Sequence, residues 1–232
     1  MTTRLVLFDI DGTLLLSAGA GRRAIMAAME DLLPAGQDYQ QVRFDGKTDP
    51  QIVAELLAAA GDAEPDNPAT IGRVLDRYVA LLERELSAGE RRAELLRGVA
   101  DLLDALERES SVMLGLLTGN VVPGAHLKLR AAGLDPGRFR VGAYGSDSHH
   151  RPDLPPIATR RAADLLGHEP EGDRVVIIGD TPADVTCGAG IGARAIAVAT
   201  GAYPIEELEA YLPWRAFPDL GNTDAVVEAI LA

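Results

Sequence analysis

Residues 4–15, RLVLFDIDGTLL, decide the fold class and point to the site. The apolar run is typical of a strand that is buried on both faces, as in a parallel sheet. Gly12 and Thr13 then indicate a turn. Asp9 and Asp11 end the run with one isoleucine between them, so both carboxylates point to one side of an extended chain and the isoleucine faces the core. The pair either closes the strand as an ordinary turn or forms a reaction centre.

Further apolar, β-rich runs follow the first one, with helical patterns between them. Strands are expected at residues 4–9, 111–120, 139–145, 174–180 and 193–200. Helices are expected between them at residues 98–109, 124–132, 157–166 and 183–189. This alternation with short connections predicts an α/β fold, with a Rossmann-like parallel sheet covered by helices on both faces.

The interval 15–95 departs from this alternation. It carries helical patterns and no convincing strand, and the patterns cover residues 21–34, 50–61 and 70–96. The simplest explanation is an all-helical insertion after the first strand. We therefore expect a discontinuous α/β core formed by residues 1–14 and 96–232, with the insertion at 15–95.

Composition narrows the class of protein. The 232 residues are 47% hydrophobic and 25% charged, which is ordinary for a globular protein. No apolar run approaches the roughly 18 residues that a membrane span needs, and no signal peptide is recognisable, so we expect no membrane partner. The single cysteine, Cys187, cannot form an intramolecular disulfide and fits a small packed side chain in a cytoplasmic protein. Composition does not distinguish a monomer from a homodimer.

The formal net charge of −13 argues against nucleic acid or an anionic membrane as a partner, because both normally require a basic face. An anionic substrate would be repelled at long range, so local cations would have to reverse the field at the site. A small phosphorylated metabolite fits this charge distribution better than a polyanion does.

Chemically active side chains follow the expected strands. The carboxyl ends of parallel strands meet at one edge of a sheet, where ligands bind in open α/β folds. Local structure explains some of these residues singly: Asp11 precedes a glycine as in a turn, and Asp184 fits a helix capping box that begins at Thr181. It does not explain why so many share one edge. The residues expected there are Asp9, Asp11, Thr118, Gly119, Asn120, Asp180 and Asp184.

Phosphoryl transfer through an aspartyl phosphate suits this set. One of the paired aspartates would attack phosphorus, and the other would protonate the leaving oxygen and then activate water. Mg²⁺ prefers oxygen ligands and would offset the repulsion between carboxylates and phosphate, with Asp9 and Asp180 as ligands. Thr118 and nearby backbone N–H groups would hold phosphate oxygens, and Gly12 and Gly119 would let the backbone approach them.

Three segments resemble motifs of the haloacid dehalogenase-like hydrolase superfamily: FDIDGTLL, LLTGN and IIGDTPADV, at residues 8–15, 116–120 and 177–185. Their order and spacing run through nearly the whole expected core. The resemblance implies Asp9 as the nucleophile, Asp11 as the acid/base and Thr118 as a phosphate ligand. Gly119 and Asn120, beside Thr118, become candidate substrate contacts.

The same resemblance implies a magnesium site and a cap. The ion would be bound by the Asp9 carboxylate, the Asp11 backbone carbonyl and Asp180, with Asp184 in support. The helical insertion would be a cap that closes over the site, and FDGKTDPQI at residues 44–52 is similar to the cap loop of phosphoglycolate-phosphatase-like members. Lys47 in that loop either meets a substrate anion or is an exposed lysine beside a helix N-cap at Asp49.

The third motif of the family usually supplies a lysine before a helix, and this chain has none there. The corresponding region, HHRPDLPPIATRRAADLLG at residues 149–167, offers Arg151 instead. A planar, permanently charged guanidinium could neutralise both the nucleophile and the phosphate. Lys128, which could also contact substrate, and Arg160 are the alternatives for this cation. His149 and His150 are interpreted as loop residues.

These observations predict a magnesium-dependent phosphatase that acts on a small phosphomonoester, with phosphoglycolate or a similar metabolite as the leading substrate. A phosphomutase would share the catalytic residues, and a non-catalytic phospho-ligand-binding protein would result if the arginine disabled turnover. A dehalogenase needs neither Asp11 as acid/base nor magnesium. A receiver-type signalling domain is about half this length and lacks a cap.

Overall fold

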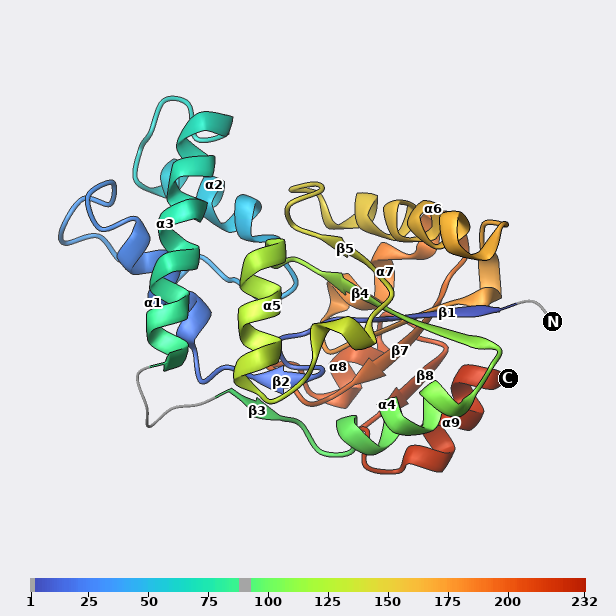
Figure 1. Cartoon of the computed structure of the whole chain (residues 1–232). Helices are drawn as coiled ribbons and strands as arrows, with labels where there is room; N and C mark the ends of the chain where they lie inside the picture. Colours follow the sequence, from blue (N-terminus) through green and yellow to red (C-terminus); the bar gives the residue numbers. More distant parts are fainter. Residues whose placement is uncertain (1–2, 88–92) are drawn as a thin grey trace.

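The computed structural model describes residues 3–87 and 93–232, and a six-stranded sheet forms their centre (Figure 1). The strand order is β5-β4-β1-β6-β7-β8, and every neighbouring pair is parallel. The strands are β1 (Arg4–Phe8), β4 (Val112–Thr118), β5 (Val141–Tyr144), β6 (Val175–Gly179), β7 (Arg194–Val198) and β8 (Arg215–Phe217). The first five confirm the predicted strands and the α/β class. The edge strand β8 was not predicted, because three partly exposed residues carry no apolar run.

Helices cover both faces of the sheet, and β1 shows why. Its side chains alternate between two buried clusters, with Val6 and Phe8 in one and Leu5 and Leu7 in the other. The first cluster is completed by α4 (Val99–Arg108), α5 (Val122–Ala131) and α9 (Thr223–Leu231). The second is completed by α6 (Leu154–Leu166) and α7 (Pro182–Cys187). The remaining α-helix of the core, α8 (Ile205–Glu209), lies between β7 and β8 in the chain. Among the described residues, none of the helices is both long and apolar enough to cross a bilayer.

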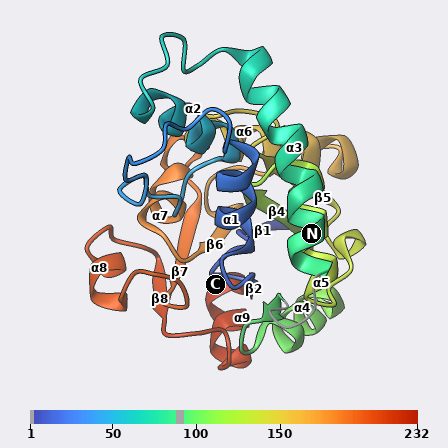
Figure 2. The same ribbon diagram turned by 90° about the vertical axis from the view of Figure 1, so that its left-hand side faces the viewer.

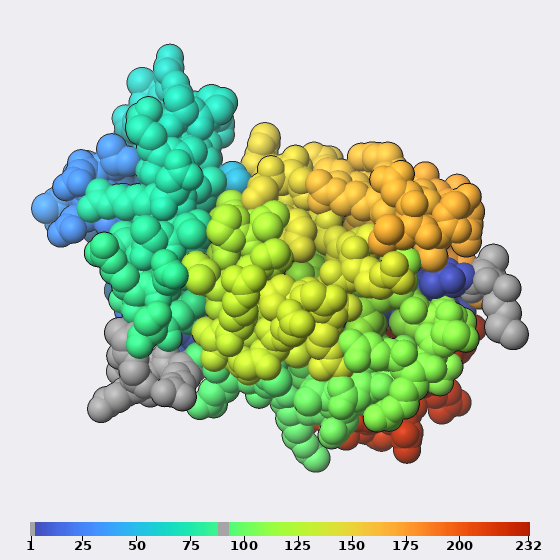
Figure 3. Space-filling view, viewed as in Figure 1, coloured from blue at the N-terminus to red at the C-terminus, as the bar shows by residue number. Residues whose placement is uncertain are grey.

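Three helices form the cap: α1 (Ala20–Ala28), α2 (Asp49–Ala59) and α3 (Pro68–Ser87). They bury an apolar cluster of their own, which includes Ile25, Leu56 and Tyr78. Figure 3 shows the cap as a separate lobe beside the core, and Figure 2 views the molecule from the cap side. The predicted third helix extended to residue 96, but α3 ends at Ser87, and residues 88–92 lie outside the described part of the chain.

The expectation of no strand within 15–95 was wrong. β2 (Leu15–Leu16) pairs with β3 (Glu94–Leu95) in a small antiparallel sheet. Two residues are too few to show an alternating pattern, and the pairing exists only because the two connections between core and cap run side by side. This ribbon lies at the ends of the proposed insertion. The assignment of residues 1–14 and 96–232 to the core and of 15–95 to the cap remains our proposal.

The sheet brings three strand ends together beneath the cap. β1 is central, with Phe8 in register with Leu116 of β4 on one side and with Ile178 of β6 on the other. The segments that follow Phe8, Thr118 and Gly179 therefore start side by side, although they are far apart in sequence. Their side chains form one wall of a cavity whose other wall is the cap.

Candidate active site

A cavity of about 450 Å³ lies between these strand ends and the cap. Core and cap residues share its lining. From the core come Asp9, Asp11, Thr118, Gly119, Asn120, Lys128, Arg151 and Asp180, and from the cap come Lys47, Asp49 and Tyr78. The predicted residues at the strand ends therefore meet at one place, as parallel strand order requires.

Three carboxylates gather at the floor of this cavity. Asp9 follows β1, Asp180 follows β6 and Asp184 lies in the first turn of α7, and one oxygen of each lies within 4.8 Å of the others. All three are buried, with relative exposures of 6%, 4% and 1%. Burial, followed by the charges of Asp184 and Asp9, raises the pKa of Asp180 well above its ordinary value. Burial also raises the pKa of Asp9 to about 7, because it outweighs the opposing charge of Arg151. A cation among these oxygens would relieve the repulsion, so the donor set fits a hard divalent metal.

Arg151 supplies the positive charge beside Asp9. It begins a short 3₁₀ helix (Arg151–Asp153), and its Nη2 lies 3.3 Å from Asp9 Oδ1 and also hydrogen-bonds Asp184. Burial lowers the pKa of this guanidinium, but the two aspartates outweigh it and raise the pKa above its ordinary value. Of the three candidate cations, the structure brings Arg151 to Asp9, whereas Arg160 is exposed on α6 and Lys128 lies beside a different aspartate.

Asp184 has the predicted capping role and a second one. Its Oδ2 accepts hydrogen bonds from Thr181 N (3.0 Å) and Thr181 Oγ1 (2.7 Å), which completes the capping box of α7. Its Oδ1 accepts from Arg151. Because protein donors occupy both of its oxygens, Asp184 orients Arg151 and helps to hold the carboxylate cluster in place.

Asp11 is held in a separate polar network. Its Oδ2 lies 2.6 Å from Lys128 Nζ and 2.9 Å from Asn120 Nδ2, and its Oδ1 accepts a longer bond from Ser17. Lys128 Nζ also donates to Asn120 Oδ1 at 2.6 Å. Burial tends to raise the pKa of Asp11. The charge of Lys128 and the hydrogen bonds from Lys128 and Asn120 outweigh burial and lower this pKa below its ordinary value. Asp9 and Asp11 thus share one cavity in different electrostatic environments.

Thr118 and Gly119 lie between these two networks. Thr118 is fully buried, and its Oγ1 accepts from Asn120 Nδ2 at 2.8 Å. A Cβ built on Gly119 would lie 2.0 Å from the backbone oxygen of Lys47, so the missing side chain makes room for the cap loop, residues 44–48. Gly119 O in turn accepts from Asp49 N at 2.7 Å. A direct contact of Gly119 with substrate stays a prediction.

Lys47 lines the cavity, but its ammonium forms an ion pair with Glu55 on α2. The expected N-cap at Asp49 was wrong by one residue. Thr48 is the N-cap of α2, since its Oγ1 accepts from Gln51 N, and Asp49 is the first helical residue. An Asp before a proline suits both positions, so the local sequence did not distinguish them.

Sequence reasoning missed two polar residues that line the cavity, Asp49 and Tyr78, and one that bonds to its floor, Thr13. Thr13 donates to Asp180 Oδ1 at 2.9 Å, and its place in the first motif was the available signal. Asp49 is buried and accepts from Val121 N at 2.8 Å, which binds the cap to the start of α5. Tyr78 is fully buried in α3. It stands at an apolar position of that helix, and nothing local distinguishes it from a core residue.

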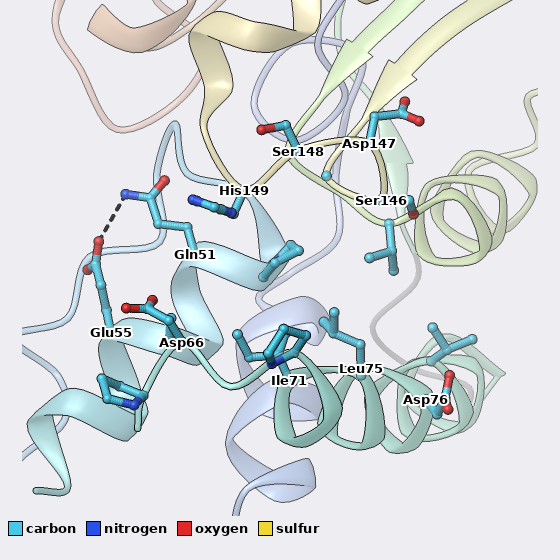
Figure 4. A pocket seen from close by; sticks show the side chains of 18 of the residues that line it. Gln51, Glu55, Asp66, Ile71, Leu75, Asp76, Ser146, Asp147, Ser148 and His149 are labelled. Carbon is cyan, nitrogen blue, oxygen red and sulfur yellow. Dashed lines mark hydrogen bonds between the residues drawn. The ribbon is translucent and has the colours of Figure 1, made fainter. Parts of the chain in front are cut away.

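A second cavity, of about 700 Å³, lies between α2, α3 and residues 145–149 (Figure 4). Ile71 and Leu75 contribute apolar side chains to it, and His149 and Asp66 stand near its edge in the figure. Within the described residues, the only carboxylate cluster suited to a metal is the one in the smaller cavity. The smaller cavity is therefore the candidate active site, despite its lesser volume.

Comparison with known proteins agrees with the motifs and the topology. The haloacid dehalogenase-like hydrolase family model matches residues 3–192. A phosphoglycolate phosphatase of Rhodospirillum rubrum is 30% identical over 224 residues, which cover 94% of this chain and 89% of that protein.

Solved structures share the fold at lower identity. A hydrolase from Pseudomonas syringae matches with a TM-score of 0.74 and 22% identity over 98% of both chains. CbbY from Rhodobacter sphaeroides, solved in complex with phosphate, matches with a TM-score of 0.72 and 21% identity over 95% of this chain and 96% of that one. By its motifs, its sheet order and the family match over most of its length, the chain belongs to the haloacid dehalogenase-like hydrolase family.

Proposed function

We propose that the protein is a magnesium-dependent phosphatase that hydrolyses a small phosphomonoester through an aspartyl phosphate on Asp9. The observation that carries this proposal is the separation of two aspartates that share one cavity. Asp9 lies with Asp180, Asp184 and Arg151, whereas Asp11 lies with Lys128 and Asn120. One carboxylate is thereby placed to attack phosphorus, and the other to exchange a proton with the leaving oxygen.

Asp9, Asp180 and the backbone carbonyl of Asp11 would hold Mg²⁺, with Asp184 supporting them. Bound there, the ion would neutralise phosphoryl oxygens as negative charge develops on them. The three buried carboxylates within 4.8 Å of each other support this assignment, because oxygen ligands of this kind are those that Mg²⁺ prefers.

The side chains divide the reaction into two displacements. In the first, an Asp9 oxygen forms a bond to phosphorus, the bond from phosphorus to the leaving oxygen breaks, and Asp11 gives that oxygen its proton. In the second, Asp11 takes a proton from water as the water oxygen attacks phosphorus. The bond from Asp9 to phosphorus then breaks, which releases phosphate, returns Asp9 to its carboxylate form and leaves Asp11 protonated for the next cycle.

The neighbouring groups would bind and orient the phosphoryl group. Thr118, Gly119 and Asn120 line the cavity at the end of β4, so the Thr118 hydroxyl and the backbone N–H groups after it are the expected donors to phosphate oxygens. Arg151 balances the charge of Asp9 before the phosphoryl group arrives and can meet the equatorial oxygens afterwards. Lys47 would contact the anion only after leaving Glu55.

The substrate would be a compact metabolite, since the cavity holds about 450 Å³ and the chain as a whole repels polyanions. The name of the R. rubrum relative supports phosphoglycolate as one candidate. A CbbY variant from R. sphaeroides was solved with xylulose-(1,5)bisphosphate, so sugar phosphates are a second group of candidate substrates.

Hydrolysis of p-nitrophenyl phosphate tests the proposal. We expect turnover with Mg²⁺, loss of turnover when EDTA is present, and loss of turnover in Asp9→Asn at saturating Mg²⁺. Asp164→Asn, an exposed aspartate on α6, is the matched control and should leave the rate unchanged. Equal rates with Mg²⁺ and EDTA, or full activity in Asp9→Asn, would show that the mechanism is wrong.

A further inference from the structure

The hydroxyl of Tyr78 has no hydrogen-bond partner among the described residues, although it is completely buried. Tyr78 belongs to α3 of the cap and lines the catalytic cavity. A buried hydroxyl without a partner is destabilising and rare in native proteins. The proposed active site has no other use for this group, so a ligand in the cavity is the natural partner for it.

Residues without side chains surround this hydroxyl at the junction between cap and core. A Cβ built on Gly21 of α1 would lie 3.2 Å from Lys128 Nζ and 3.8 Å from Tyr78 Oη. Lys128 and Tyr78 therefore both pack against this glycine, and all three residues line the cavity. A Cβ on Gly124 of α5 would lie 3.5 Å from the same hydroxyl. Two glycines, one on each side of the junction between cap and core, keep side-chain bulk away from Tyr78.

Asp49 adds an acceptor to this corner of the cavity. Its Oδ2 accepts from Val121 N, while no donor among the described residues reaches its Oδ1. Burial raises the pKa of the Tyr78 hydroxyl well above its ordinary value, and the charges of Asp49 and Asp11 raise it further. The phenol thus stays protonated and can both donate and accept a hydrogen bond.

The corner lies on the side of the site where the alcohol part of a substrate would extend. In the proposed function the phosphoryl group is bound at Asp9 and Thr118, and the leaving oxygen meets Asp11. Asp11 is joined to Lys128 at 2.6 Å, and Lys128 and Tyr78 pack against the same glycine, Gly21. Atoms attached to the leaving oxygen would therefore pass from Asp11 towards Tyr78.

We propose that Tyr78, Asp49 and Lys128 form a subsite for a hydroxyl group on the alcohol part of the substrate. The enzyme would accordingly prefer phosphate esters of polyhydroxy alcohols, such as polyols and sugars, to esters whose alcohol part carries a carboxylate. This inference rests on the proposed phosphatase function and specifies its substrate class.

Charge decides between a hydroxyl and a carboxylate at this subsite. Among the three residues of the subsite the cation is Lys128, which already contacts Asp11 and Asn120, and Asp49 adds a negative charge. A substrate carboxylate would be repelled by Asp49 and would have no free cation among these three residues. A neutral hydroxyl can donate to Asp49 and accept from Tyr78, so it satisfies the buried phenol without adding charge.

Three esters of similar size test the substrate class: sn-glycerol 3-phosphate, phosphoglycolate and n-propyl phosphate, compared by kcat/KM at saturating Mg²⁺. We expect glycerol phosphate to exceed both others by at least about tenfold, because a site built to bind a hydroxyl discriminates against analogues without one. A higher value for phosphoglycolate, equal values for all three, or hydrolysis of none of them would overturn the subsite. Absence of any p-nitrophenyl phosphate hydrolysis with Mg²⁺ would instead show that the proposed function itself fails.

Tyr78→Phe and Gly21→Ala test the residues. Each should reduce the preference for glycerol phosphate over propyl phosphate by about tenfold. Tyr211→Phe, a half-exposed tyrosine outside the cavity, is the matched control and should preserve that preference. Equal loss on every ester in both variants would indicate a structural role and contradict the proposal.

Thermal unfolding tests the premise of the subsite independently of activity. Because Tyr78→Phe removes a buried hydroxyl without a partner, its Tm should rise by about 2–4 °C relative to the wild type. A fall in Tm, or failure of the variant to fold, would show that the hydroxyl is bonded within the protein. Either result would remove the premise of the subsite.

Discussion

The guanidinium of Arg151 lies between two buried carboxylates, 3.3 Å from Asp9 Oδ1 and hydrogen-bonded to Asp184. An arginine at this place stays charged at any working pH and offers several donors in a fixed plane. The lysine that the family usually carries there is a single point charge on a flexible chain. The charge of Asp9, the proposed nucleophile, is therefore balanced here by one guanidinium that Asp184 orients.

Arg151→Ala should lower kcat by at least about tenfold and destabilise the fold by about 3–5 kcal/mol, because it leaves a buried carboxylate pair uncompensated. Arg151→Lys should recover part of both losses, since it restores the charge without the planar geometry. Steady-state kinetics and urea unfolding measure the two effects. Arg160→Ala, at an exposed position of α6, serves as control. A loss at Arg160 equal to that at Arg151 would contradict the assignment.

Asp49 predicts a pH dependence of stability. Burial raises its pKa from the ordinary 3.8 to about 6, so the folded state binds a proton more readily than the unfolded state does. The stability that follows is present below about pH 4 and is lost as the pH rises to about 6, by about 3 kcal/mol in total. Asp49→Asn should lack this loss.

Urea unfolding of the wild type and Asp49→Asn at intervals between pH 4 and pH 7 measures the difference. The free energy of unfolding of the variant, relative to the wild type, should increase through this range. Asp164→Asn, at an exposed aspartate, should track the wild type at every pH. A constant difference between wild type and Asp49→Asn would mean that the pKa of Asp49 is not raised.

At the scale of the elements, the start of α2 joins the cap to the core. Thr48 Oγ1 donates to His149 O at 2.8 Å, Asp49 N donates to Gly119 O at 2.7 Å, and Val121 N donates to Asp49 Oδ2 at 2.8 Å. These bonds reach the segments that follow β4 and β5. The part of the cap loop that precedes α2, residues 44–48, therefore takes its position from the same strand ends that carry the proposed catalytic residues.

Gly119→Ala should separate these elements. A Cβ at this position would meet the backbone oxygen of Lys47 at 2.0 Å, so the cap loop has to move. We expect kcat/KM to fall by at least about tenfold, because a misplaced substrate contact of about 1 Å can cost two orders of magnitude.

Gly190→Ala is the matched control, since a Cβ there meets nothing within 4 Å. Kinetics with p-nitrophenyl phosphate and thermal unfolding of both variants make the comparison. Wild-type activity in Gly119→Ala would show that the closed arrangement of the cap loop is not needed for turnover.

At the scale of the whole molecule, the site gathers negative charge in a protein that is already negatively charged overall, which makes the cluster less stable. The chain carries a net charge of −13, and Asp9, Asp180 and Asp184 crowd together in its interior. Arg151 is the cation that contacts this cluster among the described residues. Binding of Mg²⁺ should therefore stabilise the folded state as well as support catalysis.

Addition of millimolar Mg²⁺ to EDTA-treated protein should raise Tm, by the mass action of an ion that binds only the folded state. Asp180→Asn should show a much smaller rise, because it removes a carboxylate from the proposed ligand set. Differential scanning fluorimetry with and without Mg²⁺ measures both. An equal rise in the wild type and Asp180→Asn would place the ion elsewhere.

Much of the core could be predicted from local patterns, since burial on both faces leaves a continuous apolar run. Residues 4–8 and 175–179 are such runs, and each ends at an aspartate of the site. The capping box at Thr181 and Asp184 is a local interaction and could equally be predicted from the sequence. β8, β2 and β3 were not, because two or three residues become strands only when a neighbouring segment pairs with them.

The sequence by itself therefore determined the α/β class, the order of the strands along the chain and the aspartates that end them. Tertiary structure alone decided which cation serves which carboxylate, with Arg151 at Asp9 and Lys128 at Asp11. It also decided that Tyr78, an apolar-position residue of a cap helix, lines the cavity with a buried hydroxyl that has no partner among the described residues. The physical reason is the separation of the residues along the chain. Burial and capping produce patterns within a few neighbouring residues, whereas ion pairs join segments that only the folded chain brings together.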